Sequence, residues 1–311
     1  MAPRRPLPEA DVDLPANHPF RTEAARDRYL DAYRRRAAHW PVPARDRYVQ
    51  TAYGRTYVRE CGPEGAAPLV LLPGIGASSL MWTGMAGMLA RSHRVLAVDV
   101  VDDHGLSACT VSPRDGAGYA RWIEDLLDGL RLREGVGMVG ASYGGWMAME
   151  HALRHPERLR RLALVAPVGV VARLSPGFAW RGLLGQLPWR ACFRPLMRWM
   201  AGGLARGNEE QRALFEEMVD DGYTATRCFR PRRPAYPRVM CDREWATLAV
   251  PTLFLAGLED RCVPVAKAIA RLRRVAPTVR IETLAGAGHD LFATHPEESC
   301  RVLLGFLDEG A

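Results

Sequence analysis

The chain of 311 residues lacks the features of a membrane-spanning, exported or disulfide-bonded protein. No stretch approaches the roughly 18 uninterrupted apolar residues that a membrane span requires. The first 20 residues, rich in proline and charge, lack the apolar run of a secretory signal. The seven cysteines are scattered and include no C-x-x-C pair, which argues against a disulfide framework or a zinc site. We therefore expect a cytoplasmic protein without a membrane or metal partner.

Lysine is also nearly absent, because Lys267 is the only lysine among 42 basic residues. The net charge of +7 thus rests on arginine, in a sequence that is also rich in alanine and glycine. This bias is typical of GC-rich coding, which spreads arginine over ordinary surfaces. A nucleic-acid-binding face would cluster its charge within a recognisable module, and the sequence contains neither. Nucleic acid is therefore not an expected partner, although a basic surface could attract an acidic substrate or carrier protein.

Short apolar runs alternate with amphipathic stretches along most of the chain, which is typical of an α/β fold. A mostly parallel sheet, covered by helices on both faces, buries strands of this kind. A hairpin over 46–61, with its turn near Tyr53 and Gly54, precedes the alternation. The predicted strands cover residues 67–74, 93–101, 135–141, 161–167, 250–257 and 279–284.

Two segments interrupt this pattern and suggest a division of the chain. Residues 1–47 contain a proline-rich arm and then an amphipathic helix over 22–40. Residues 168–245 contain several helix-like segments and a proline-broken run, and we interpret them as a helical cap. Residues 48–167 and 246–311 then form the α/β core.

A serine stands at the junction between the strand 135–141 and the helix that follows it. The sequence around Ser142, G-A-S-Y-G, fits the G-x-S-x-G nucleophile elbow, in which a strand turns sharply into a helix and exposes the serine hydroxyl. A hydroxyl is a poor nucleophile unless a histidine accepts its proton and a carboxylate orients that histidine. The strand before the motif and the helix after it are the context that the motif requires.

Two later loops offer the acid and the base. Asp260 lies in the turn after the strand 250–257, with Glu259 beside it as a rival acid. His289 lies in a glycine-containing loop after the last strand, and the carboxyl ends of parallel strands meet at one edge of a sheet. His104, in a loop, is expected to have a turn or surface role, and His295 to stand at the start of the final helix.

The segments LLPGIGASSLMW, GASYGG, GLEDRCVP and GAGHD resemble the α/β-hydrolase family, and the resemblance extends from about residue 48 to the end of the chain. Within the family, the chain looks most like small bacterial carboxylesterases with an N-terminal helix. The resemblance implies that Ser142 is the nucleophile, Asp260 the orienting acid and His289 the base. It also implies that the backbone N–H groups of Ile75 and Tyr143 form the oxyanion hole.

One departure concerns the oxyanion loop, where Pro73 precedes Gly74 and the family commonly has histidine. Proline removes a side-chain hydrogen bond and a backbone donor at position 73, but it leaves the amide of Ile75 in place. The departure puts the shape of the oxyanion hole in question.

The expected reaction is hydrolysis of a small or medium apolar ester or thioester through an acyl-enzyme, with no metal or organic cofactor. Trp82 and Trp146 are candidates for lining the substrate pocket, with plain core packing as the alternative. A thioesterase, lactonase, carbon–carbon hydrolase or cyclase could use the same residues, and the fold also serves as a non-catalytic ligand-binding scaffold. The sequence gives no indication of oligomeric state.

Overall fold

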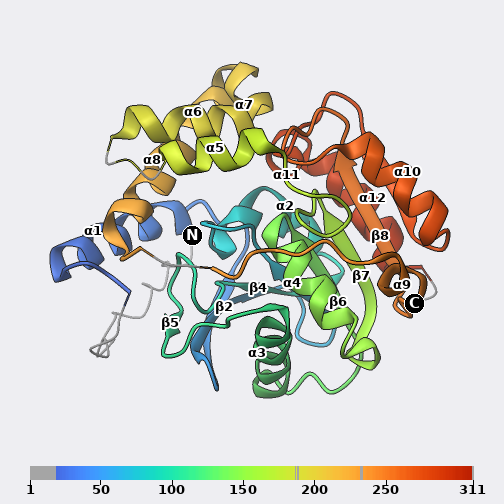
Figure 1. Cartoon of the computed structure of the whole chain (residues 1–311). Helices are drawn as coiled ribbons and strands as arrows, with labels where there is room; N and C mark the ends of the chain where they lie inside the picture. Colours follow the sequence, from blue (N-terminus) through green and yellow to red (C-terminus); the bar gives the residue numbers. More distant parts are fainter. Residues whose placement is uncertain (1–18, 186, 188, 232–233, 310–311) are drawn as a thin grey trace.

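The computed structural model describes residues 19–185, 187, 189–231 and 234–309, and in this part of the chain a nine-stranded sheet forms the centre (Figure 1). The strands run in the order β1-β2-β4-β3-β6-β7-β8-β9, and the short β5 pairs with β2. Their bounds are β1 Ala44–Thr51, β2 Gly54–Cys61, β3 Ala67–Leu72, β4 His93–Val98, β5 Ala108–Cys109, β6 Val136–Ala141, β7 Leu159–Val165, β8 Thr252–Gly257 and β9 Arg280–Leu284.

Along the sheet order β4-β3-β6-β7-β8-β9, every pairing is parallel. At the other end of the sheet, β2 pairs antiparallel with β1, β4 and β5. The predicted α/β class and the mostly parallel sheet are therefore confirmed. The short β5 was not predicted, because two residues carry no recognisable alternation. Parallel pairing brings the carboxyl ends of β3, β6, β8 and β9 to one edge, where the loops after them meet.

Helices cover both faces of the sheet and enclose two buried apolar clusters. One cluster joins the sheet to α3 (Gly116–Gly129), α4 (Tyr143–Ala152) and α10 (Val265–Val275). The other joins it to α1 (Glu23–Ala37), α2 (Thr83–Leu89) and α12 (Pro296–Leu307). The remaining elements here are the 3-10 helices η1 (Ser79–Trp82) and η2 (Pro156–Arg158), and the short α11 (Leu291–Thr294).

The segment that we predicted as a cap folds into helices that lie over one edge of the sheet, drawn in yellow-green to orange in Figure 1. They are α5 (Pro176–Gly185), α6 (Arg190–Met200), α7 (Gly202–Arg206) and α8 (Glu209–Cys228), and α9 (Asp242–Ala246) follows on the way back to the sheet. Ala201, Leu204, Phe215 and Val219 form a small separate core among these helices. The predicted cap segment thus has apolar packing of its own, beside its contacts with the rest of the chain.

The helix α1 links the N-terminal segment to the cap and to the sheet. Thr22 caps it, because its side-chain oxygen accepts the backbone N–H of Ala25 at 3.1 Å. The ring of Tyr29 packs edge-on against Phe229, directly after α8, with ring centroids 4.8 Å apart.

In the described residues, no helix is long and apolar enough to cross a membrane.

Candidate active site

Ser142 occupies a strained turn between β6 and α4. Its backbone has φ 51° and ψ −116°, an unusual conformation for a residue with a side chain, and such strain costs about 1–3 kcal/mol. The surrounding backbone holds the turn, because the Ser142 N–H donates to the carbonyl of Val165 at 2.9 Å and its own carbonyl accepts from Gly145 at 3.0 Å. The strand and the helix thereby fix the direction of the hydroxyl.

Glycine is required where the chain passes close to this turn. A Cβ on Gly144 would collide with the carbonyl oxygens of Leu72 and Pro73, at the end of β3. A Cβ on Gly74 would lie 3.3 Å from the Cβ of Ser142 and 3.7 Å from its Oγ. The absence of side chains therefore lets the loop after β3 pack directly against the serine.

The structure brings Ser142, His289 and Asp260 together in one chain of hydrogen bonds. The Nε2 atom of His289 lies 3.0 Å from Ser142 Oγ, and Nδ1 lies 2.8 Å from Asp260 Oδ2. The other carboxylate oxygen of Asp260 accepts the backbone N–H of Cys262 at 2.7 Å. The rival acid Glu259 points elsewhere: its side chain is 57% exposed and lies 3.7 Å from Arg206.

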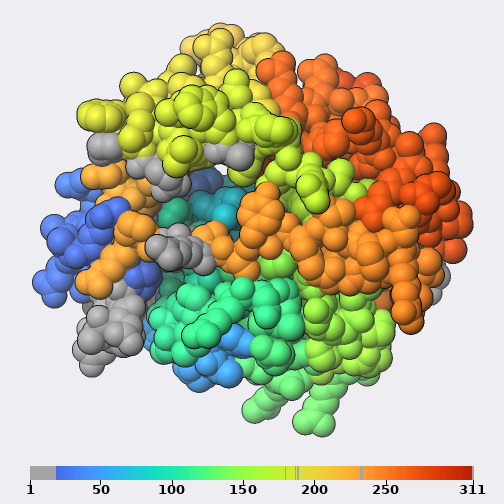
Figure 2. Space-filling view, in the orientation of Figure 1, coloured from blue at the N-terminus to red at the C-terminus, as the bar shows by residue number. Residues whose placement is uncertain are grey.

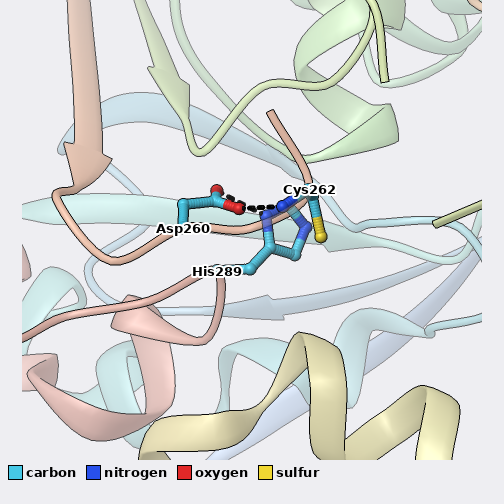
Figure 3. A group of neighbouring side chains, drawn as sticks. All are labelled: Asp260, Cys262 and His289. Carbon is cyan, nitrogen blue, oxygen red and sulfur yellow. Dashed lines mark hydrogen bonds and ion pairs between the residues drawn. The ribbon is translucent and has the colours of Figure 1, made fainter. Parts of the chain in front are cut away.

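The environment of His289 favours the charged imidazole. Burial opposes protonation, but the carboxylate of Asp260, 2.8 Å from Nδ1, outweighs it and holds the pKa of His289 well above its ordinary value of 6.5. Burial raises the pKa of the Cys262 thiol, so this group is protonated at neutral pH. Figure 3 shows its sulfur beside the imidazole. This contact has no signature in the sequence, because Cys262 and His289 stand on separate loops.

Of the two predicted oxyanion-hole residues, Tyr143 directly follows the serine, and Ile75 follows Gly74, which packs against it. Tyr143 is the first residue of α4, so its amide belongs to the positive end of the helix dipole. Its hydroxyl donates to the carbonyl of Ala235 at 2.7 Å, which connects it to the chain returning from the cap. Ile75 is 43% exposed in the loop that packs against Ser142.

Two buried carboxylates after β4 hold the loop of residues 73–79, which we call the oxyanion loop after the function predicted for Ile75. Asp103 accepts the N–H of Gly76 at 2.9 Å, and Asp99 accepts the N–H of Ser79 at 2.6 Å. The hydroxyl of Tyr33, on α1, lies 3.1 Å from Ser79 Oγ and 3.3 Å from Asp99. Sequence reasoning missed these supports, and the acidic run D-D at 102–103 was the only signal for them.

The two tryptophans proposed for the pocket are both buried. Trp82 is 0% exposed within the cluster of α2 and α12, and Trp146 is 1% exposed within the cluster of α3 and α4. Large apolar rings in a close-packed interior contribute to the core, so the packing alternative is the better interpretation of both.

The remaining histidine candidates have local partners. His104 donates from Nδ1 to the carbonyl of Gly76 at 3.2 Å, so it supports the oxyanion loop. His295 directly precedes α12, where we expected it.

The cap is tied to the loop that carries His289. The next residue, Asp290, is 2% exposed and accepts the N–H of Leu204, in α7, at 3.0 Å. In the space-filling view, the surface is hollowed beneath the yellow-green cap helices, and teal atoms from around residues 75–100 are visible in its depth (Figure 2).

Comparison with known proteins identifies the family of this chain. Residues 69–302 match the model of the Alpha/beta hydrolase family, which is most of the chain. The chain belongs to the α/β-hydrolase family. The resemblance read from the four motifs is thereby confirmed at the level of the family.

Several members of this family are similar to nearly the whole chain. The carboxylesterase YbfK of Bacillus subtilis is 27% identical over 91% of this chain and 94% of its own length. Its crystal structure superposes with a TM-score of 0.83, covering 93% of this chain and 100% of that one, at 26% identity. The naproxen esterase of Bacillus subtilis gives a TM-score of 0.82 at 27% identity, over 91% of this chain and 98% of that one.

A 2-hydroxymuconate semialdehyde hydrolase of Pseudomonas putida is 31% identical, over 86% of this chain and 95% of its own length. Relatives that match a similar share of this chain are therefore named for different reactions, as a carboxylesterase in one case and a 2-hydroxymuconate semialdehyde hydrolase in the other.

Proposed function

We propose that this α/β hydrolase is a serine carboxylesterase in which Ser142, His289 and Asp260 form the catalytic triad. The observation that carries the proposal is the continuous hydrogen-bonded chain, 3.0 Å from Ser142 Oγ to His289 Nε2 and 2.8 Å from Nδ1 to Asp260. Its groups stand in the order that general-base activation of a serine requires. The similarity to two carboxylesterases supports ester hydrolysis as the reaction.

The reaction proceeds by acyl transfer in two stages. His289 accepts the Ser142 proton while Oγ attacks the ester carbonyl, and it then donates this proton to the departing alcohol. Water, deprotonated by the same imidazole, hydrolyses the acyl-enzyme and restores the serine. Asp260 keeps the proton on Nδ1 of the neutral ring and stabilises the imidazolium that forms in each stage.

The N–H groups of Ile75 and Tyr143 bind the oxygen that becomes negative in the tetrahedral intermediate. Such fixed donors act on charge that develops during the reaction, and removing one costs about 10²–10³ in kcat in a related mechanism. The position of Tyr143 at the start of α4 and the packing of Gly74 against Ser142 support this assignment.

The substrate that we propose is a small or medium apolar ester that enters beneath the cap. The cap closes over it and excludes bulk water, with the bond between Asp290 and Leu204 linking the cap to the base. We place the protein in the cytoplasm, and the seven free cysteines support a reducing compartment.

Carbon–carbon bond hydrolysis is a second candidate reaction, favoured by the relative from Pseudomonas putida. The same triad serves either reaction, so the two proposals differ in the substrate that the cap admits. Comparing turnover of a 2-hydroxymuconate semialdehyde with that of simple esters decides between them.

The test of the main proposal is hydrolysis of p-nitrophenyl esters of increasing acyl length by the wild type and by Ser142→Ala. We expect turnover by the wild type, a loss on the order of 10⁶ in kcat for the variant, and labelling of Ser142 alone by a fluorophosphonate. Absence of both turnover and labelling in a folded wild type would refute the serine-esterase proposal. It would also favour a non-catalytic role for the pocket.

A further inference from the structure

A thiol that the proposed reaction does not use lies against the base and the acid. Cys262 follows β8 by five residues and is 0% exposed. One ligand atom from each of Asp260, Cys262 and His289 lies within 4.8 Å of the others, and Figure 3 shows the three side chains converging. The three groups come from two loops, 258–264 and 285–290, that the parallel sheet brings together.

Sulfur, nitrogen and oxygen donors in one cluster suit a thiophilic cation. Zn²⁺ binds cysteine, histidine and carboxylate ligands at about 2.0–2.3 Å, so the ligand atoms of a tetrahedral ion stand about 3.4–3.6 Å apart. The Nδ1–Oδ2 separation of 2.8 Å is already shorter than this, and no separation exceeds 4.8 Å. To bind the ion, the Nδ1–Oδ2 pair has to separate slightly and the other ligand atoms have to approach one another by at most about 1.4 Å.

The charges also balance within the buried cluster. The ion displaces the thiol proton to solvent, and the His289 nitrogen that binds it also gives up its proton, to solvent when the imidazole is charged. One thiolate and one carboxylate then neutralise the two positive charges of the ion beside a neutral imidazole. No net charge is left in the interior, where an uncompensated charge is costly. The His289 side chain is 11% exposed, so the cluster has contact with solvent through the imidazole.

We propose that Asp260, Cys262 and His289 form an inhibitory binding site for a thiophilic divalent cation such as Zn²⁺ or Cd²⁺. An ion on Nδ1 of His289 replaces the hydrogen bond to Asp260. An ion on Nε2 occupies the lone pair that would accept the Ser142 proton. Either mode stops general-base catalysis. Binding at this site is independent of the proposed esterase function, whereas the inhibition rests on it.

The binding test uses Cd²⁺ as the probe, with the full chain in equilibrium dialysis and with the near-ultraviolet absorbance of the cadmium–thiolate bond. We expect one tightly bound ion per chain, and at least about tenfold weaker binding for Cys262→Ala. Cys241→Ala, at an exposed cysteine, and Cys228→Ala, at a buried one, are the matched controls and should retain the ion. Cys262→Ser keeps the size of the side chain if the alanine variant does not fold.

The inhibition test measures p-nitrophenyl acetate hydrolysis against Zn²⁺, with each variant normalised to its own metal-free rate. We expect inhibition that a chelator reverses, and at least about tenfold lower sensitivity in Cys262→Ala. Cadmium binding or zinc inhibition that does not depend on Cys262 would overturn the metal site and leave the esterase proposal intact. A wild type that binds Cd²⁺ through Cys262 but hydrolyses no ester would support the metal site and refute the esterase proposal.

Discussion

Replacing Asp103 by asparagine tests how the oxyanion loop is held. One carboxylate oxygen accepts the N–H of Gly76 at 2.9 Å, and the other accepts the N–H of His104 at 2.6 Å. Gly76 directly follows Ile75, whose amide we assign to the oxyanion hole. Asparagine keeps one acceptor oxygen but turns an NH₂ group toward one of the two backbone donors. The substitution therefore weakens the support of the loop while nearly conserving its volume.

The magnitude follows from the bond that is lost. A hydrogen bond to a charged group contributes about 1.5–3 kcal/mol, which corresponds to about 10- to 150-fold in a rate if the whole amount appears in the transition state. Complete loss of an oxyanion donor costs about 10²–10³ in kcat. Because the Ile75 amide remains and only its support weakens, we expect kcat to fall about 10- to 100-fold and KM to change little.

The assay is steady-state hydrolysis of p-nitrophenyl acetate, combined with thermal unfolding of each variant. Asp115→Asn is the matched control: Asp115 also accepts a backbone N–H, from Gly118 at 2.8 Å, but as the N-cap of α3. Asparagine is an equally good N-cap, so this variant should keep both activity and stability. If Asp103→Asn unfolds at a lower temperature but keeps its kcat, the carboxylate supports the fold alone and the reasoning fails.

Three further predictions concern the acid, the base and the N-terminal helix. Asp260→Asn should lower kcat on the order of 10⁴-fold, whereas Glu259→Gln should not; equal losses would show that the acid is wrongly assigned. Because His289 acts as a neutral base and its pKa is raised, kcat/KM should rise with pH through a midpoint above 6.5, and a midpoint at or below 6.5 would contradict the environment described. Tyr33→Phe removes the hydroxyl that reaches the oxyanion loop, so urea unfolding should show a loss of about 0.5–1.5 kcal/mol. Tyr29→Phe, on the same helix, should lose less, and identical losses would argue against a specific role for Tyr33.

The sequence predicts the fold well because strands in a parallel sheet are buried on both faces. Such strands appear as short apolar runs, so the strands and the helices between them can be recognised along the sequence. The motif around Ser142 marks where one of the strands ends. The shortest strand, β5, was missed because its pairing with β2 depends on contacts formed elsewhere. The assigned functions of Ser142, Asp260 and His289 remain predictions, although the structure places the three in contact.

Features that depend on contacts between distant segments could not be read in advance. Apolar tryptophans look alike whether they line a pocket or fill the core, and only packing distinguishes Trp82 and Trp146 as core residues. In the same way, Cys262 lies 27 positions from His289 in the sequence, and the two meet only because β8 and β9 are neighbours in the sheet. To predict contacts of this kind, one needs the order and register of the strands in the sheet as well as the amino-acid sequence.

The oxyanion loop explains how proline can occupy position 73. In many members of the family a histidine side chain stands there, and proline supplies neither that hydrogen bond nor a backbone donor. Here the supports act further along the loop: Asp103 and His104 bind the N–H and carbonyl of Gly76, and Asp99 binds the N–H of Ser79. These contacts constrain the backbone on the far side of Ile75, while Gly74 packs against Ser142 on the near side. The amide of Ile75 is therefore held between two fixed points, and its position does not require any side chain at residue 73.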